Sequence, residues 1–150
     1  MKHLQILAPD VFAQLESVDG AQLRWICFRV CEYAATANGL LDTVVQEALG
    51  YLKSRQECQC GWLKELDELV NSFDDKYFDL KEQAEDTENS RERESLLLLS
   101  GEYFRKARVV AAICAATDKD PFEAATEAIY EAAASVEKNE IVFDLVMSLL

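Results

Sequence analysis

Histidine, the side chain most often used for acid–base catalysis near neutral pH, occurs once in the 150-residue chain, as His3. A histidine this close to a chain end, where helices commonly fray, is a poor centre for a nucleophile–base–acid arrangement. The sequence also lacks the G-x-x-x-x-G-K-[ST] and G-x-G-x-x-G loops that hold nucleotide phosphates. We therefore expect that the chain is not an enzyme and uses no cofactor.

The five cysteines, Cys27, Cys31, Cys58, Cys60 and Cys114, are the next candidates for chemistry. Because disulfide-stabilised secreted scaffolds usually carry an even number of cysteines, the odd count favours free thiols in a reducing cytoplasm. Four thiolates can hold zinc, but structural zinc sites usually use C-x₂₋₄-C pairs on turns. Cys27 and Cys31 instead fall in the apolar stripe of one helical pattern, so packing as small hydrophobic residues is expected. The role of the Cys58-x-Cys60 pair stays open.

Carboxylates concentrate in the stretch ELDELVNSFDDKYFDLKEQAEDTE, residues 65–88, which has ten acidic residues and two lysines. Acidic helices can bind hard cations such as Mg²⁺, so a metal-dependent hydrolase stays open as a third interpretation of the chain. The Glu-x-x-His pairs of di-iron bundles are absent, and the segment DDKYFD has no second Asp/Glu motif to face it. The sequence therefore predicts no metal site.

Placed on a helix at about 100° per residue, residues 65–88 separate into two faces. With Glu68 at zero, Asp75, Asp79, Glu82 and Asp86 fall within about 40° of it. Between roughly 100° and 200° lie the apolar residues Leu66, Leu69, Val70, Phe73, Tyr77, Leu80 and Ala84. A disordered acidic tail would lack such a stripe, so the pattern predicts a long amphipathic helix with one anionic face.

Helical periodicity also runs through the rest of the chain. Helices are expected over 7–20, with Gly20 ending the helix, and over 21–36 and 40–55. Residues 87–95 read as a polar connection, or as the end of one helix and the start of the next. The second half of 96–120 is apolar nearly all round, which is typical of a central helix packed on several sides.

Asp120 and Pro121 have the residue types of an N-cap and a first helical position, so another helix is expected to begin there, followed by a last helix over 138–150. No segment alternates with the period of a strand. Residues 1–150 are therefore predicted to form a single all-α domain, an antiparallel helical bundle of about six to seven helices.

The formal charge of −13 resides in two regions, −8 over 65–88 and −5 over 121–150. Lys76 can pair with Asp79, and Lys81 with Glu85, so little of the charge in 65–88 is neutralised locally. Binding to nucleic acid or anionic lipid needs clustered Lys and Arg, so neither is expected. Apolar runs are far shorter than the ~20 residues of a membrane span, and a cytoplasmic protein is expected. A solvated helix face and a surface for a basic protein partner both stay open.

Two segments resemble a known group of proteins. LRWICFRVCEYAATANGLLDTVVQEALGYLKS (23–54) pairs a Trp/Cys-bearing helix with a second amphipathic helix, and ARVVAAICAATDKDPFEAATEAIYEAAA (107–134) joins two Ala-rich helices by a short turn. Together they resemble small, all-helical immunity proteins encoded beside bacterial polymorphic or contact-dependent toxins. The resemblance implies a cytoplasmic protein without catalytic activity that binds one cognate toxin domain and blocks its active site or substrate entry.

Many such toxins are nucleases with basic clefts, so a carboxylate-lined helix would replace the phosphate backbone there. The hypothesis is that Glu68, Asp75, Asp79, Glu82 and Asp86 contact the basic partner. A second candidate surface is formed by the carboxylates of the Ala-rich helix, Glu123, Glu127 and Glu131.

Aromatic side chains beside the acidic face are candidate anchors for the same partner: Tyr77, Phe78 and Tyr103. Phe78 lies outside the apolar stripe, at about −80°, and packing under a neighbouring helix is the alternative for it. The alternative for the whole chain is a helical adaptor or regulatory protein that binds another basic protein.

Overall fold

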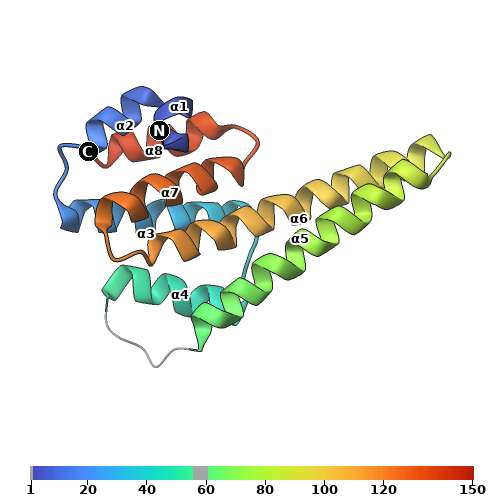
Figure 1. Cartoon of the computed structure of the whole chain (residues 1–150), viewed down its shortest axis with the longest axis horizontal. Helices are drawn as coiled ribbons and strands as arrows, with labels where there is room; N and C mark the ends of the chain where they lie inside the picture. The colour runs from blue at the N-terminus through green and yellow to red at the C-terminus, as the bar shows by residue number, and fades with distance from the viewer. Residues whose placement is uncertain (1, 56–60) are drawn as a thin grey trace.

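The computed structural model describes residues 2–55 and 61–150 (Figure 1). All regular structure in that part is helical, which confirms the predicted all-α fold. The described residues form eight helices rather than six to seven: α1 (His3–Leu7), α2 (Pro9–Leu15), α3 (Gly20–Ala37), α4 (Thr43–Ser54), α5 (Trp62–Asp86), α6 (Ser90–Ala116), α7 (Pro121–Ala134) and α8 (Asn139–Ser148).

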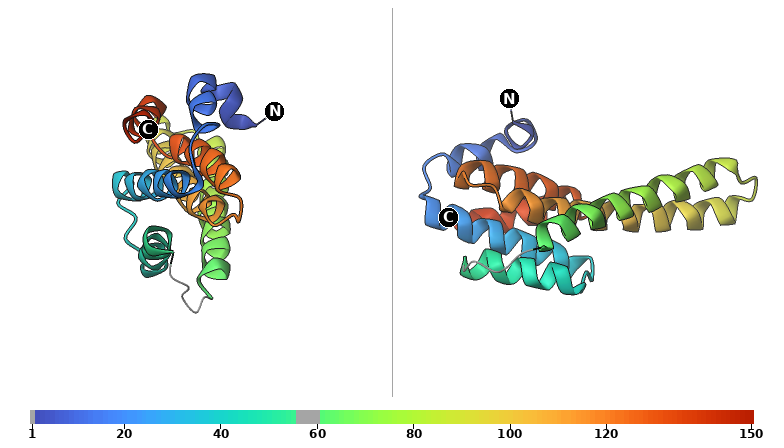
Figure 2. Two further views of the ribbon diagram at one scale, coloured as in Figure 1. Left: turned by 90° about the vertical axis from the view of Figure 1, so that its left-hand side faces the viewer. Right: turned by 60° about the horizontal axis from the view of Figure 1, so that its bottom comes forward.

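The helices form a body from which α5 and α6 project as a long antiparallel pair (Figures 1 and 2). The start of α5 packs against α4, and the end of α6 packs against α3, α4 and α7. In the part of the chain that the structure describes, the rest of the two long helices packs mainly on each other. We call the projecting part of this pair, residues 74–104, the arm.

The seam between α5 and α6 is apolar. Phe73 and Ala84 of α5 are buried, and the Phe73 ring lies 6.0 Å from the ring of Tyr103 on α6. At the far end, Arg93 donates hydrogen bonds to the carbonyl oxygens of Ala84 at 3.2 Å and Thr87 at 2.6 Å. These bonds satisfy carbonyl groups that the end of a helix leaves without partners. The two helices are therefore held together by apolar packing along their length and by hydrogen bonds at the tip.

The turn between the two long helices is set by Thr87 and Asn89. Thr87 adopts extended backbone angles and ends α5, and the Asn89 side chain accepts hydrogen bonds from the backbone N–H groups of Arg91 and Glu92. Such an N-cap satisfies donors that the first turn leaves free. Residues 87–95 are therefore the end of one helix and the start of the next, one of the two readings that the sequence allowed.

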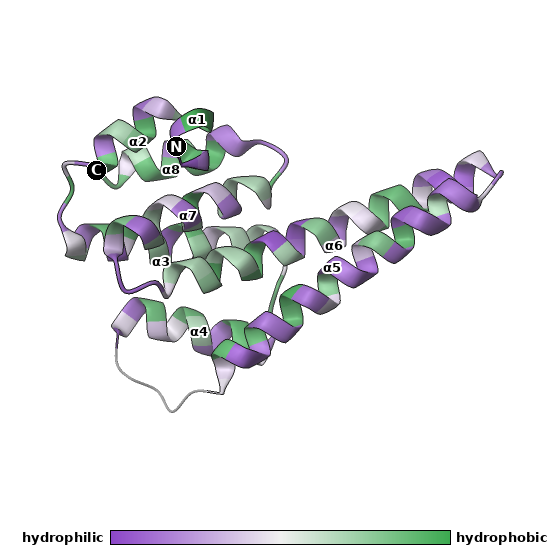
Figure 3. Ribbon diagram, in the orientation of Figure 1, coloured by the Kyte–Doolittle hydropathy of each residue, from purple (hydrophilic) through white to green (hydrophobic). Residues whose placement is uncertain are grey.

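The C-terminal half of α6 lies at the centre of the body, as its nearly all-round apolar sequence predicted. Figure 3 shows this half as mostly apolar, whereas hydrophilic and apolar residues alternate along α5. Its buried residues are Ala107, Val109, Val110, Ala112, Ile113 and Ala116. Many of these residues are small, as are most of the buried residues of α7, so helices can approach one another closely here.

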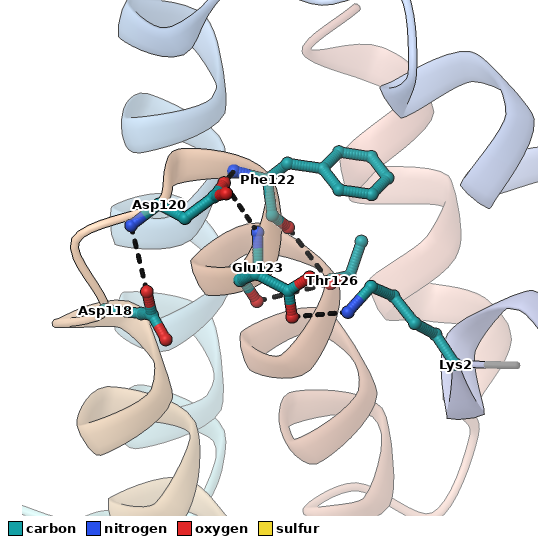
Figure 4. A network of polar contacts seen from close by, with 6 residues as sticks. All are labelled: Lys2, Asp118, Asp120, Phe122, Glu123 and Thr126. Atoms are coloured by element: carbon teal, nitrogen blue, oxygen red, sulfur yellow. Dashed lines mark hydrogen bonds and ion pairs between the residues drawn. The ribbon is translucent and has the colours of Figure 1, made fainter.

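The start of α7 confirms the capping prediction (Figure 4). The Asp120 carboxylate accepts hydrogen bonds from the backbone N–H groups of Phe122 at 2.9 Å and Glu123 at 3.3 Å, and Pro121 occupies the first turn. The Asp118 side chain accepts a further bond from the Asp120 N–H at 2.9 Å, which braces the turn that precedes the helix. The helix therefore begins where its side chains supply acceptors for its unpaired donors.

The helix predicted over 7–20 is present as α2, with Pro9 in its first turn, but its predicted extent was wrong. The chain breaks at Ala8, whose backbone angles (φ −142°, ψ 73°) are not helical, because a residue that precedes proline is disfavoured in the helical region. Gly20 does not end a helix but begins α3, after Asp19 accepts a hydrogen bond from the Gln22 N–H at 2.8 Å. A Cβ at Gly20 would lie 3.5 Å from Pro121, an ordinary van der Waals distance, so the start of α3 lies beside the start of α7 without requiring glycine there.

Candidate protein-binding surface

The five carboxylates predicted to face a partner all lie exposed on α5: Glu68, Asp75, Asp79, Glu82 and Asp86. Within residues 2–55 and 61–150, none of them forms an ion pair. The opposite stripe of the helix is buried or half-buried against α6 and the body, as the helical projection predicted. We call these five residues the acidic face; four of them lie on the arm.

The two lysines of the arm lie over aromatic rings instead of pairing with the carboxylates of α5. The Lys76 ammonium is 5.1 Å from the ring centre of Tyr103, and the Lys81 ammonium is 5.7 Å from that of Tyr77. Neither Lys76–Asp79 nor Lys81–Glu85 is among the ion pairs of the described residues, so the predicted pairing was wrong. These two ammonium groups therefore lie against ring faces and form no ion pair with the carboxylates of the acidic face in the described chain.

Phe78 lies beside the acidic face with 62% of its surface exposed, so no helix of the described chain covers it. Its ring packs on Tyr77 at 4.9 Å between ring centres, and Tyr77 in turn contacts Phe104 of α6 at 5.3 Å. Tyr103, the third candidate anchor, is only partly exposed and packs on Phe73 in the seam. Of the predicted anchors, Phe78 is thus the one that is presented to the outside.

The second candidate surface, on α7, is largely occupied by contacts within the chain. Glu123 pairs with Lys2 (Figure 4). Glu131 accepts a hydrogen bond from Arg108 Nη1 at 3.1 Å, and Glu127 is half-buried. Burial raises the pKa of the Glu131 carboxyl, although the neighbouring Arg108 guanidinium opposes that shift. These three carboxylates are less available to a partner than the acidic face of α5.

Arg108 contacts one carboxylate from each of the two acidic regions. Its Nη2 lies 3.4 Å from Asp74 Oδ1 on α5, and its Nη1 bonds to Glu131 on α7. Asp74 was not among the residues predicted to bind a partner, and here its charge is balanced by Arg108. The two regions are therefore joined through a shared cation and do not merge into one open anionic surface.

The other groups that could do chemistry are dispersed or buried. In the part of the chain that the structure describes, no three His, Cys, Asp or Glu side chains are grouped as metal ligands would be. The His3 ring lies 4.9 Å from the ring of Tyr130. No helix among the described residues is long and apolar enough to cross a membrane.

Cys27 and Cys31 are fully buried, which confirms their prediction as packing residues. Burial raises the pKa of the Cys27 thiol to about 12 and holds the pKa of the Cys31 thiol well above its usual range. Burial, with a contribution from the nearby Asp67 carboxylate, raises the pKa of Cys114 to about 12. These thiols are therefore protonated at neutral pH and poorly reactive. Cys58 and Cys60 lie outside the described residues.

Sequence reasoning missed the exposed apolar residues of α6 on the arm. Leu97, Leu98 and Leu99 expose 47%, 69% and 40% of their surfaces, and Phe104 exposes 37%. The signal was present in the run of four leucines at 96–99, because consecutive residues point about 100° apart and cannot all face α5.

Comparison with protein-family models, with curated proteins and with solved structures finds no match to this chain. The candidate surface consists of the acidic face, whose carboxylates form no ion pair with other described residues, and of the exposed Phe78 beside it.

Proposed function

We propose that the chain is a non-catalytic protein-binding module whose acidic face binds a basic protein. The observation that carries this proposal is that five carboxylates with no ion-pair partner among residues 2–55 and 61–150 line the exposed face of one helix, mostly on a projecting arm. Following the sequence resemblance, we propose that the partner is a cognate bacterial toxin domain, most simply a nuclease, and that the chain is its cytoplasmic immunity protein.

The shape of the arm suits such a role. Carboxylates three and four residues apart on a helix are separated by about 5–6 Å, so α5 presents a row of negative charges along one side. A cleft built to bind a phosphate backbone presents a complementary row of Lys and Arg. Inserting the arm would neutralise those cations and exclude the nucleic acid, and the concentrated charge would make association fast and dependent on salt.

The test is co-expression of this chain with the product of the neighbouring gene, read by pull-down and by growth of the cells. The Asp75→Lys, Asp79→Lys double variant reverses two charges of the acidic face. The matched control is Glu47→Lys, Asp144→Lys, which changes the net charge equally at exposed carboxylates of α4 and α8 that form no ion pair in the described chain.

We expect the wild type and the control to retain the neighbouring protein and to protect growth, and the double variant on the arm to lose most of both. Equal retention by both variants would show that the acidic face is not the binding surface. Capture of a neighbour that is harmless when expressed alone would support basic-partner binding and would contradict the immunity role.

A further inference from the structure

One side of the arm carries a group of exposed and half-buried residues, and Phe78, Leu97 and Phe104 are the exposed large apolar side chains among them. We call this group the side face: Tyr77 and Phe78 of α5, and Leu97, Gly101 and Phe104 of α6. The Lys81 ammonium lies 5.7 Å from the ring centre of Tyr77, and the Arg108 guanidinium lies 5.7 Å from that of Phe104. The ring contacts from Phe78 to Tyr77 and from Tyr77 to Phe104 place the two helices' contributions on the same side. Leu97, Gly101 and Phe104 follow the four- and three-residue spacing of a single helix face.

The spacing of side chains along the side face matches the spacing of side chains on one face of another helix. Seven residues separate Leu97 from Phe104, about 10.5 Å along the axis of α6, which is the distance between side chains two turns apart on another helix. Gly101 lies between them, and a Cβ there would meet only the Arg105 guanidinium, at 3.4 Å. Glycine in a helix interior costs about 1 kcal/mol relative to alanine, and here it leaves room for a backbone to approach.

The side face has defined ends. Toward the body, the ion pairs of Arg108 with Asp74 and Glu131 close it. Toward the tip, Arg93 donates hydrogen bonds to the carbonyl groups of Ala84 in α5 and of Thr87 just after it. The distance along the axis of α6 from Phe104 to the start of the helix is about 21 Å, so a helix of roughly 14 residues could lie beside it.

The two edges of the side face differ in charge, because Arg105 and Arg108 lie on the α6 edge beside Gly101 and Phe104, so the α5 edge is the one that indicates where a basic occupant would bind. Phe78 is flanked one turn before and after by Asp74, Asp75 and Glu82, and by Lys81, whose ammonium lies against Tyr77. Of the three carboxylates, only Asp74 is engaged in an ion pair among the described residues. The rim of the side face on α5 is therefore anionic and continuous with the acidic face.

We propose that the side face binds an amphipathic helix of the partner, with an apolar stripe that contacts Phe78, Leu97 and Phe104 and with Lys or Arg residues along the edge that meets α5. The bound segment would turn the two-helix arm into a three-helix bundle and bury apolar surface that the arm leaves exposed. This inference rests on the proposed binding of a basic protein and specifies the structure of the bound segment.

A second copy of this chain is the competing occupant. Its net charge of −13 and its own anionic arm would oppose close packing of two arms, whereas a basic helix is attracted to the same rim. The charge balance therefore favours a basic partner over self-association.

The experiment uses three synthetic helical peptides of about 15 residues, each stapled to hold the helix, with the full chain. The first has a Leu/Phe stripe at i, i+3, i+4 and i+7 with Lys and Arg on its flanks. The second has the same stripe with Glu flanks. The third has the composition of the first with the stripe scrambled. Binding is measured by fluorescence anisotropy at two salt concentrations, and the site is located by chemical-shift changes.

We expect the first peptide to bind at least tenfold more tightly than the other two, with shift changes concentrated at Tyr77, Phe78, Leu97 and Phe104. Phe78→Ala and Leu97→Ala should each weaken binding roughly tenfold. Leu98→Ala is the matched control, because Leu98 is the more exposed leucine but points about 100° away from Leu97. Circular dichroism and thermal unfolding confirm that each variant keeps its fold.

Equal binding of the basic striped and basic scrambled peptides, unaffected by Phe78→Ala, would overturn the proposed helix while leaving binding by the acidic face intact. Failure of both basic peptides to bind at low salt would contradict both proposals. A dimer in light scattering that Phe78→Ala dissociates would assign the side face to a second copy of this chain and overturn the inference.

Discussion

Arg108 of α6 and Glu131 of α7 are joined by a hydrogen-bonded ion pair of 3.1 Å, at the place where the arm leaves the body. The same guanidinium contacts Asp74 of α5 at 3.4 Å. One side chain thus connects the two helices of the arm to the helix bundle behind them.

Replacing Arg108 with alanine is expected to destabilise the protein by about 1–3 kcal/mol, because two partly buried carboxylates would lose their counter-ion. Arg91→Ala is the control, since Arg91 is exposed near the tip and forms no ion pair within the described chain. Urea unfolding of both variants measures the difference. If R108A lowers the free energy of unfolding no more than R91A does, the ion pairs of Arg108 contribute little to stability.

The pKa of Glu131 predicts a pH dependence of stability. Burial raises this pKa, with Glu127 adding to the rise and Arg108 and His3 opposing it. A carboxyl whose pKa is higher in the folded state stabilises the protein below the unfolded pKa, and that contribution is lost as pH rises through the folded pKa. The free energy of unfolding of the wild type, relative to Glu131→Gln, should therefore decrease as the pH rises above the usual pKa of a glutamate.

Urea unfolding of the wild type and E131Q at matched pH values measures this difference. A difference that grows with pH would show that attraction to Arg108 outweighs burial, and the sign of the pKa shift would then be reversed.

The cap of α7 gives a third prediction. Asp120→Ala removes the acceptor for two backbone N–H groups and should lower the free energy of unfolding by about 1 kcal/mol. Asp10→Ala is the control, because Asp10 is also in a first helical turn but caps nothing by its side chain. Equal effects of D120A and D10A on thermal unfolding would contradict the capping role.

Thiol reactivity gives a fourth prediction. Because burial raises the pKa of the Cys27 and Cys31 thiols well above neutral, alkylation of these residues at pH 8 should be slow in the folded protein and fast in denaturant. Mass spectrometry of the peptides that contain them reads each site separately. Rapid modification of Cys31 in the folded protein would show that α3 opens readily.

Local rules in the sequence were enough to predict several elements. Asp120 and Pro121 are the residue types of a helix start, and the spacing of Leu66, Phe73 and Ala84 identifies the buried side of α5. Both signals are contained in a few neighbouring residues. The orientation of the acidic face followed from the same arithmetic, which is why its exposure could be predicted before its surroundings were known.

The arm itself could not be predicted, because periodicity tells which side of a helix is apolar and not how far a neighbour covers it. Leucine and phenylalanine are common in protein cores, yet Leu97 and Phe104 are exposed because they lie on the part of α6 that projects from the body. The pairing of Glu131 with Arg108 likewise depends on the packing of α6 against α7, which no local pattern reveals.

The acidic face as a docking surface is the central claim, and the association rate with the co-purified partner tests it most directly. Stopped-flow mixing should be carried out at a series of salt concentrations for the wild type, for D75K/D79K and for the control E47K/D144K. The account predicts fast, strongly salt-dependent association for the wild type and the control, and a lower rate with a shallower salt slope for D75K/D79K. An unchanged rate and an unchanged slope for D75K/D79K would contradict it.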